Sequence, residues 1–211
     1  MELNPRRVAW LVAANTALAP FAIDAYLPAI GILAESINAS IHHTELSISM
    51  FLFGFALGQL CFGPLSDRLG RKPVLLSGLV VFMLASLMIT TADSLTSLLV
   101  WRFIQALGGG ACVVNSAAIV RDCFSGREAA KVMSTMAMIM MLAPLVAPAV
   151  GSLLLHIAGW GLILLLLAVY PANIYVALTN GEAMDITPLI AWGRLPFQFV
   201  LIGLAYWHSK T

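Results

Sequence analysis

The chain has 211 residues, of which 61% are hydrophobic and 10% charged, with a net charge of +1 and a mean hydropathy of +0.95. A soluble domain carries about 25% charged residues, because a surface that faces water needs polar side chains. A soluble enzyme, a nucleic-acid-binding protein and a disordered chain are therefore excluded, and lipid is the solvent for most of this chain. At about 20 residues for each helical span, the length has room for six or seven spans.

Seven apolar runs follow one another along the chain, without the alternation of polar and apolar residues that is typical of membrane β-strands. Each of the first four is long enough to cross the hydrocarbon core as a helix. Small residues recur within the runs and allow close helix packing in lipid. The runs cover residues 8–34, 46–64, 74–92, 97–119, 132–156, 160–178 and 187–207. The sequence therefore predicts an all-α membrane protein.

The start of the first run imitates a secretory signal peptide. Arg6 and Arg7 precede an apolar stretch that reaches Ala17-Leu18-Ala19, a pattern like that of a cleavage site. The apolar run continues past that point, Pro20 follows it directly, and further spans come at once. These features favour a retained first span over a cleaved signal.

Lysine and arginine are distributed unevenly among the links between runs. Basic residues precede the first run and occupy the links after the second and fourth runs, whereas the links after the first, third and fifth runs contain none. Because Lys and Arg concentrate on the cytoplasmic side, this bias predicts a multi-pass protein with a cytoplasmic N-terminus. The bias holds for about the first 160 residues and fails after them, where the next link is acidic.

Two charged residues lie inside apolar runs, Asp24 in the first and Arg102 in the fourth. A charge near the bilayer centre costs at least a few kcal/mol, so such residues face a protein interior or an aqueous pathway. The functional interpretation is proton handling or substrate binding. The structural alternatives are an internal ion pair, or a side chain of Arg102 that reaches toward the membrane surface.

The link between the second and third runs has a specific pattern, Gly63-Pro-Leu-Ser-Asp67-Arg68-Leu-Gly70-Arg71-Lys72. Glycine at its two ends allows close contact and a tight reversal of the chain. We expect Asp67 to accept hydrogen bonds at a helix N-terminus, and the basic residues to lie on the cytoplasmic face or bridge to a neighbouring helix.

This pattern resembles the G-x-x-x-D-R-x-G-R-K signature of the major facilitator superfamily, with every position matched. Residues 24–29 look like the first-span acid motif of drug/proton antiporters of the Bcr/CflA type. Residues 102–108 are similar to their R-x-x-Q-G-x-G motif, with Ala106 in place of a glycine, and residues 147–152 resemble their G-P-x-x-G-G motif with Ala and Ser at two glycines. The resemblance covers about residues 5–160 and implies the N-terminal part of a six-helix half, with about five spans.

The resemblance implies a protonatable role for Asp24, whose charge would bias the carrier between its two faces. Arg102 would lie beside this acid and tune its proton affinity, as an opposite charge does. Gln105 would supply hydrogen bonds to the same acid.

The resemblance also implies roles at the two other motifs. Residues of the link would form a cytoplasmic latch that holds one conformation; these are Gly63, Asp67, Arg68, Gly70, Arg71 and Lys72. Pro144, Pro148 and Gly151 would bend the fifth span and pack it tightly. The alternative for the two prolines is ordinary packing of a membrane helix that tolerates kinks.

The resemblance to antiporters ends near residue 160, where the sixth helix of the half should follow. The last 45–50 residues look instead like the C-terminal end of DoxX-like membrane proteins. We therefore expect two parts, residues 1–160 and residues 161–211, with one or two further hydrophobic helices in the second. The alternatives are a fusion or rearranged chain, and a divergent sixth helix.

The leading functional hypothesis, which the resemblance implies, is proton-coupled multidrug efflux by antiport across the inner (plasma) membrane, incomplete in this chain. Its partners would be the bilayer, protons and a drug-like small molecule. The alternative is a non-transporting membrane remnant or a scaffold with a DoxX-like tail; a second chain that completes the carrier is a third hypothesis.

Neither a catalytic residue nor a cofactor or metal site is expected, because the sequence contains no P-loop, nucleophile triad or zinc-ligand spacing. Cys61, Cys112 and Cys123 are expected to be small apolar packing residues. The chain is therefore not expected to be an enzyme or to bind nucleic acid.

Overall fold

The computed structural model describes residues 5–158, and each regular element in this range is a helix. Five segments are long and apolar enough to cross a membrane, at Val12–Ser36, Ile41–Leu69, Arg71–Thr90, Leu95–Cys123 and Gly126–His156. The prediction of an all-α membrane protein with about five spans in this part is confirmed. The two apolar runs predicted at 160–178 and 187–207 lie outside the described residues.

The first span is divided into three pieces. α1 (Pro5–Asp24) ends in mid-span, the short 3-10 helix η1 (Leu27–Ala29) follows, and α2 (Ile30–Ser36) completes the crossing. Pro28 explains the division, because it has no N–H group to donate to the carbonyl of Asp24 four residues earlier. The apolar pattern predicts one helix over 8–34 and does not reveal this break.

The other spans are continuous helices, and three of them, α3 (Ile41–Leu69), α5 (Leu95–Cys123) and α6 (Gly126–Ala158), extend past both ends of the predicted apolar runs. α3 and α5 each begin at a serine cap, since Ser40 accepts a hydrogen bond from the His43 N–H and Ser94 accepts one from the Ser97 N–H. A single residue, Gly70, separates α3 from α4 (Arg71–Thr90). Its φ of +95° suits glycine and allows the tight reversal that the sequence predicts. α6 runs through both of its prolines.

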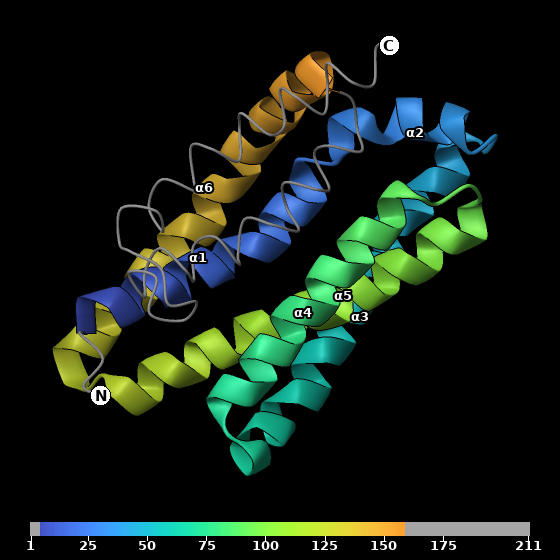
Figure 1. The fold of residues 1–211 in the computed structure, drawn as a ribbon. Helices are drawn as coiled ribbons and strands as arrows, with labels where there is room; N and C mark the ends of the chain where they lie inside the picture. The colour runs from blue at the N-terminus through green and yellow to red at the C-terminus, as the bar shows by residue number, and fades with distance from the viewer. Residues whose placement is uncertain (1–4, 159–211) are drawn as a thin grey trace, which may run out of the picture.

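α5 is the central helix of the described part and contacts α1, α3, α4 and α6. In Figure 1, α3, α4 and α5 form one group, and α1 lies beside α6. Glycines permit the close approach of α3 to α5: a Cβ atom added at Gly58 would lie 2.7 Å from the carbonyl oxygen of Leu107. In lipid, where contact between backbones replaces the hydrophobic drive, such glycines hold helices together.

Candidate functional site

Arg102 is a buried charge at the centre of the bundle, with 1% of its surface exposed. Its Nη1 donates one hydrogen bond to the backbone carbonyl of Ala22 (3.1 Å) and another to Oε1 of Gln105 (3.0 Å). The side chain does not reach toward the membrane surface, although the sequence left that alternative open. It connects α5 with the last turn of α1.

A chain of hydrogen bonds continues from Arg102 to α4. Nε2 of Gln105 donates to Oγ of Ser86 (2.7 Å), and this hydroxyl donates to the carbonyl of Phe82 (2.7 Å). Gln105 and Ser86 are both fully buried. The network therefore joins α1, α5 and α4 in the membrane interior, where an unpaired polar group is costly.

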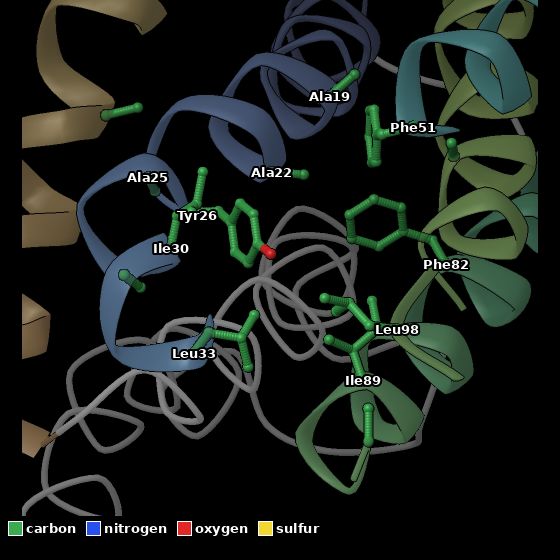
Figure 2. Packing of buried hydrophobic residues seen from close by; sticks show 14 of the residues in the cluster. Ala19, Ala22, Ala25, Tyr26, Ile30, Leu33, Phe51, Phe82, Ile89 and Leu98 are labelled. Atoms are coloured by element: carbon green, nitrogen blue, oxygen red, sulfur yellow. The ribbon is translucent and has the colours of Figure 1, made fainter. Parts of the chain in front are cut away.

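The ring of Tyr26 covers the Arg102 guanidinium. The guanidinium carbon lies 3.6 Å from the ring centroid of Tyr26 and 5.8 Å from that of Phe51 on α3. The Tyr26 hydroxyl shares a hydrogen bond with the hydroxyl of Ser47 (3.1 Å). Figure 2 shows the Tyr26 ring directed from the broken first span into the cluster that contains Phe51 and Phe82.

The break in the first span makes the Ala22 contact possible. In an unbroken helix, the carbonyl of Ala22 would accept from the N–H of Tyr26. Here α1 ends two residues before Tyr26, and Arg102 donates to this carbonyl instead. The arginine therefore supplies a donor that the broken backbone lacks.

Asp24 is the last residue of α1 and is partly exposed. The ion pairs found among residues 8–156 include neither Asp24 nor Arg102. Arg102 instead contacts the residues that lie two positions on either side of Asp24, and its Nε and Nη2 have no hydrogen-bond partner in the described part. Gln105 likewise bonds Arg102 and Ser86, not the acid as the resemblance implies. The three residues of the predicted proton site thus lie in one region without a direct pair between the charges.

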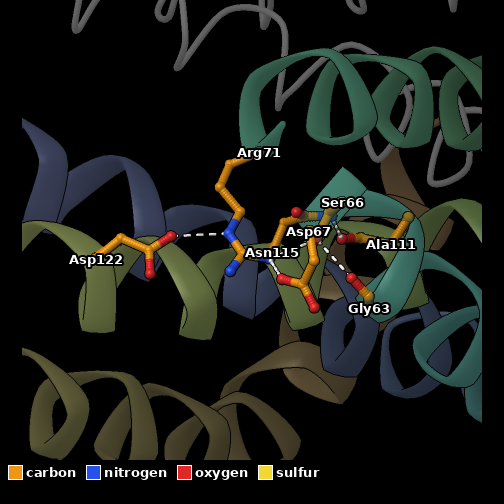
Figure 3. Close-up of polar contacts among 7 residues, drawn as sticks. All are labelled: Gly63, Ser66, Asp67, Arg71, Ala111, Asn115 and Asp122. Atoms are coloured by element: carbon orange, nitrogen blue, oxygen red, sulfur yellow. Dashed lines mark hydrogen bonds and ion pairs between the residues drawn. The ribbon is translucent and has the colours of Figure 1, made fainter. Parts of the chain in front are cut away.

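The cytoplasmic link is organised around Arg71, the first residue of α4 (Figure 3). Its Nε donates to Asp122 (2.8 Å) at the end of α5, and its Nη1 contacts Asp67 (2.5 Å) and donates to Oγ of Ser66 (2.7 Å). The sequence predicts the bridge to a neighbouring helix but not its acceptor, Asp122. Asp67 lies near the end of α3, so the expectation that it occupies a helix N-terminus is wrong.

The remaining link residues have simpler surroundings. The carbonyl of Gly63 accepts from Ser66 (2.8 Å), and Gly70 forms the turn between α3 and α4. Arg68 and Lys72 are exposed, and the ion pairs of the described part do not include them. The structure therefore brings Asp67 and Arg71 together and leaves the other two cations in solvent or at the membrane surface.

The predicted antiporter motif on α6, which contains Pro144, Pro148 and Gly151, packs at Gly151 against the break in the first span. Gly151 is buried against the backbone carbonyl of Ala25, which occupies the space that a Cβ atom would need. Pro144 is exposed and Pro148 partly exposed, both within the helix. The small residue at 151 thus allows α6 to approach the non-helical segment next to Asp24.

Comparison with known proteins identifies the family. The profile of the Major Facilitator Superfamily matches residues 12–183. The chain belongs to the major facilitator superfamily. Its described part is accordingly a multi-pass bundle of membrane helices from a family of transporters, not of enzymes.

Several curated relatives in the superfamily are named for drug resistance. The Bicyclomycin resistance protein homolog of Haemophilus influenzae is 40% identical over 143 residues, which are 68% of this chain and 36% of that protein. The Multidrug resistance protein MdtL of Klebsiella pneumoniae is 38% identical over 143 residues, with the same two shares. The Chloramphenicol resistance protein of Pseudomonas aeruginosa is 37% identical over 144 residues, 68% of this chain and 34% of that protein. The chain spans about a third of the length of these relatives.

The major facilitator match continues past residue 160, where the sequence predicts a boundary. The division into residues 1–160 and 161–211, and the DoxX-like resemblance of the second part, stay predictions. Sequence reasoning placed Tyr26 in a motif without giving it a role, and it did not find Ser47, Ser86 or Asp122. A serine in an apolar run gives no signal of which helix it contacts, and these partners meet only through the packing of separate spans.

Proposed function

We propose that this chain forms part of a proton-coupled exporter of drug-like small molecules. It works in the plasma membrane with its N-terminus in the cytoplasm, and Asp24 binds and releases the proton. The observation that carries the proposal is the buried Arg102, hydrogen-bonded to a broken membrane span two residues from Asp24. Discontinuous spans near the bilayer midplane hold substrate and coupling-ion sites in secondary transporters.

The proposed mechanism is alternating access controlled by the charge on Asp24. A carboxylate in the membrane needs a cation or donors nearby. Arg102 has two nitrogen atoms, Nε and Nη2, without acceptors in the described part. Loss of the Asp24 proton would therefore draw the acid and Arg102 together and shift the broken segment of α1 relative to α5. Protonation of Asp24 would separate the acid from Arg102 again and release the broken segment.

The cytoplasmic contacts act as the second element of the proposed mechanism. Arg71 joins the ends of α3, α4 and α5 through Asp67 and Asp122. This arrangement supports a latch that holds one conformation and opens in the other. Because these side chains are partly exposed, the latch is weak enough to break in each cycle.

The names of the relatives support drug-like substrates for this chain. They contain bicyclomycin resistance, chloramphenicol resistance and multidrug resistance. In inverted-repeat transporters the substrate lies between two halves. We therefore propose that further protein, in the same or a second chain, completes the carrier.

The test is export of a fluorescent cation from a drug-sensitive bacterial strain that expresses the chain. We expect lower accumulation of the dye than in cells with an empty vector, and restored accumulation in the Asp24→Asn variant. Asp93→Asn is the matched control, because this acid is exposed in the turn between α4 and α5 and should leave export unchanged. Equal accumulation with wild type and vector, at equal membrane expression, contradicts export by this chain and favours the non-transporting alternative.

A further inference from the structure

The buried charge of Arg102 lacks the partner that such charges normally have. A guanidinium taken out of water is stable only with well-placed acceptors or a carboxylate. In the described residues Arg102 has two acceptors, the carbonyl of Ala22 and the amide oxygen of Gln105, and both bond the same nitrogen, Nη1. Its Nε and Nη2 have none. Something else must offset the charge in this conformation.

The face of the Tyr26 ring is placed to offset the charge of Arg102. The negative face of an aromatic ring attracts a guanidinium within about 6 Å of its centroid, and the attraction increases when both groups are desolvated. Tyr26 is 2% exposed, Arg102 is 1% exposed, and the guanidinium carbon lies 3.6 Å from the ring centroid. The ring therefore takes the position at the cation that the resemblance gave to Asp24.

The ring is itself held in place from a third helix. The hydroxyls of Tyr26 and Ser47 share a hydrogen bond of 3.1 Å, and Ser47 is fully buried on α3. Tyr26 itself lies between α1 and η1, so this hydrogen bond ties the broken first span to α3. The contact with Ser47 fixes the orientation of the ring.

We infer that Tyr26 is a positioning residue: its ring, anchored on Ser47, holds the Arg102 guanidinium at the broken end of α1 and apart from Asp24. The stacking places Nη1 on the Ala22 carbonyl and leaves Nε and Nη2 unused. The consequence for transport rests on the proposed function: Tyr26 would compete with Asp24 for the cation, and the transition between states would require Arg102 to leave the ring.

The test uses the full chain in lipid nanodiscs with ¹⁵N-labelled arginine, observed by NMR. A ring face moves the resonance of a proton above it upfield, so the Nε–H of Arg102 should be shifted upfield from that of an unstacked arginine. The Arg102→Lys variant assigns the resonance by its disappearance. Tyr26→Phe should keep most of the upfield shift, because the ring remains although its hydroxyl anchor is lost, whereas Tyr26→Leu should lose the shift entirely.

Two further variants sharpen the test. Phe51→Leu should change the shift less than Tyr26→Leu, because Phe51 is the more distant ring at 5.8 Å. Ser47→Ala should reduce the upfield shift in part, since the ring loses its anchor but not its face. A folded Tyr26→Leu protein with the wild-type Arg102 shift, or a Tyr26→Phe protein without it, overturns the positioning role.

Dye export measures the consequence separately. We expect Tyr26→Phe to retain export and Tyr26→Leu to lose most of it at equal expression. If the wild-type chain does not export dye, the proposed function fails while the NMR comparison still decides the positioning role. Full export by Tyr26→Leu, together with loss of the upfield shift, overturns the competition between Tyr26 and Asp24.

Discussion

Two arginines organise this bundle, one inside the membrane and one at its cytoplasmic end, and they do so by different physics. Arg102 is buried and bonds a backbone carbonyl, an amide and an aromatic face. Arg71 is partly exposed and bonds two carboxylates and a serine hydroxyl. The cytoplasmic arginine has complementary charges, whereas the inner one has none among the described residues.

The two environments determine what each arginine can do. In water, ion pairs cost little to break, because both charges are solvated again. In the interior, a broken contact leaves a polar group unpaired, which costs far more. The Arg71 contacts therefore suit repeated opening, and the Arg102 network suits precise placement of the broken segment next to Asp24.

Replacing each arginine by alanine should give the largest difference in the free energy of unfolding. Arg102→Ala removes a buried side chain and leaves the Ala22 carbonyl and Gln105 without their donor, so it should lower the free energy of unfolding by about 3 kcal/mol. Arg71→Ala should lower it by less than about 1 kcal/mol. Denaturant unfolding in mixed micelles measures both, and equal losses would contradict the comparison.

The next effect concerns the close approach of α6 to the break in the first span. Gly151→Ala places a Cβ atom against the carbonyl of Ala25, and overpacking of this kind should cost about 2 kcal/mol. The matched control is Gly31→Ala on α2, where nothing lies within 4 Å of the added atom. The control should be neutral or slightly stabilising; a similar loss in both variants would show that the Ala25 contact is not tight.

A smaller effect is expected within the buried network. Gln105→Leu removes an acceptor from Arg102 and a donor from Ser86, which should lower the free energy of unfolding by about 1–2 kcal/mol. Ser86→Ala removes only the outer member and should cost less. Denaturant unfolding in mixed micelles ranks the two variants. A larger loss for Ser86→Ala than for Gln105→Leu would contradict the central position of Gln105 in the network.

The smallest effect is at the cytoplasmic end and depends on salt. Asp122→Asn weakens the contact with Arg71 and should cost less than about 1 kcal/mol. Raising the ionic strength should reduce this difference, because exposed charges are screened. Unfolding of wild type and variant at low and high salt tests it, with Gln105→Leu as the salt-insensitive comparison.

The sequence predicts the solvent, the spans and the position of the cytoplasmic bridge. An apolar run of about 20 residues indicates a membrane-spanning helix, so α3 to α6 follow from composition and length. The Gly70 reversal follows from the need for a tight turn between two spans. Local rules are sufficient for these features.

The arrangement around Asp24 could not be predicted in the same way. The charges of Asp24 and Arg102 suggest a direct pair, yet the structure places Tyr26 on the cation. The break at Pro28 was not predicted, and the donor that replaces the lost backbone bond comes from 80 residues further along the chain. Such partners depend on the relative rotation of packed helices, which periodicity does not determine.

Proton release from everted membrane vesicles tests whether Asp24 carries the proton that is coupled to drug export. With a pH-sensitive dye reporting a preformed proton gradient, addition of a drug that the chain exports should dissipate the gradient in wild-type vesicles. The response should be absent in Asp24→Asn vesicles and unchanged in Asp93→Asn vesicles. A drug-induced response of equal size in the Asp24→Asn variant would contradict a proton-carrying role for Asp24, because another group would then carry the proton.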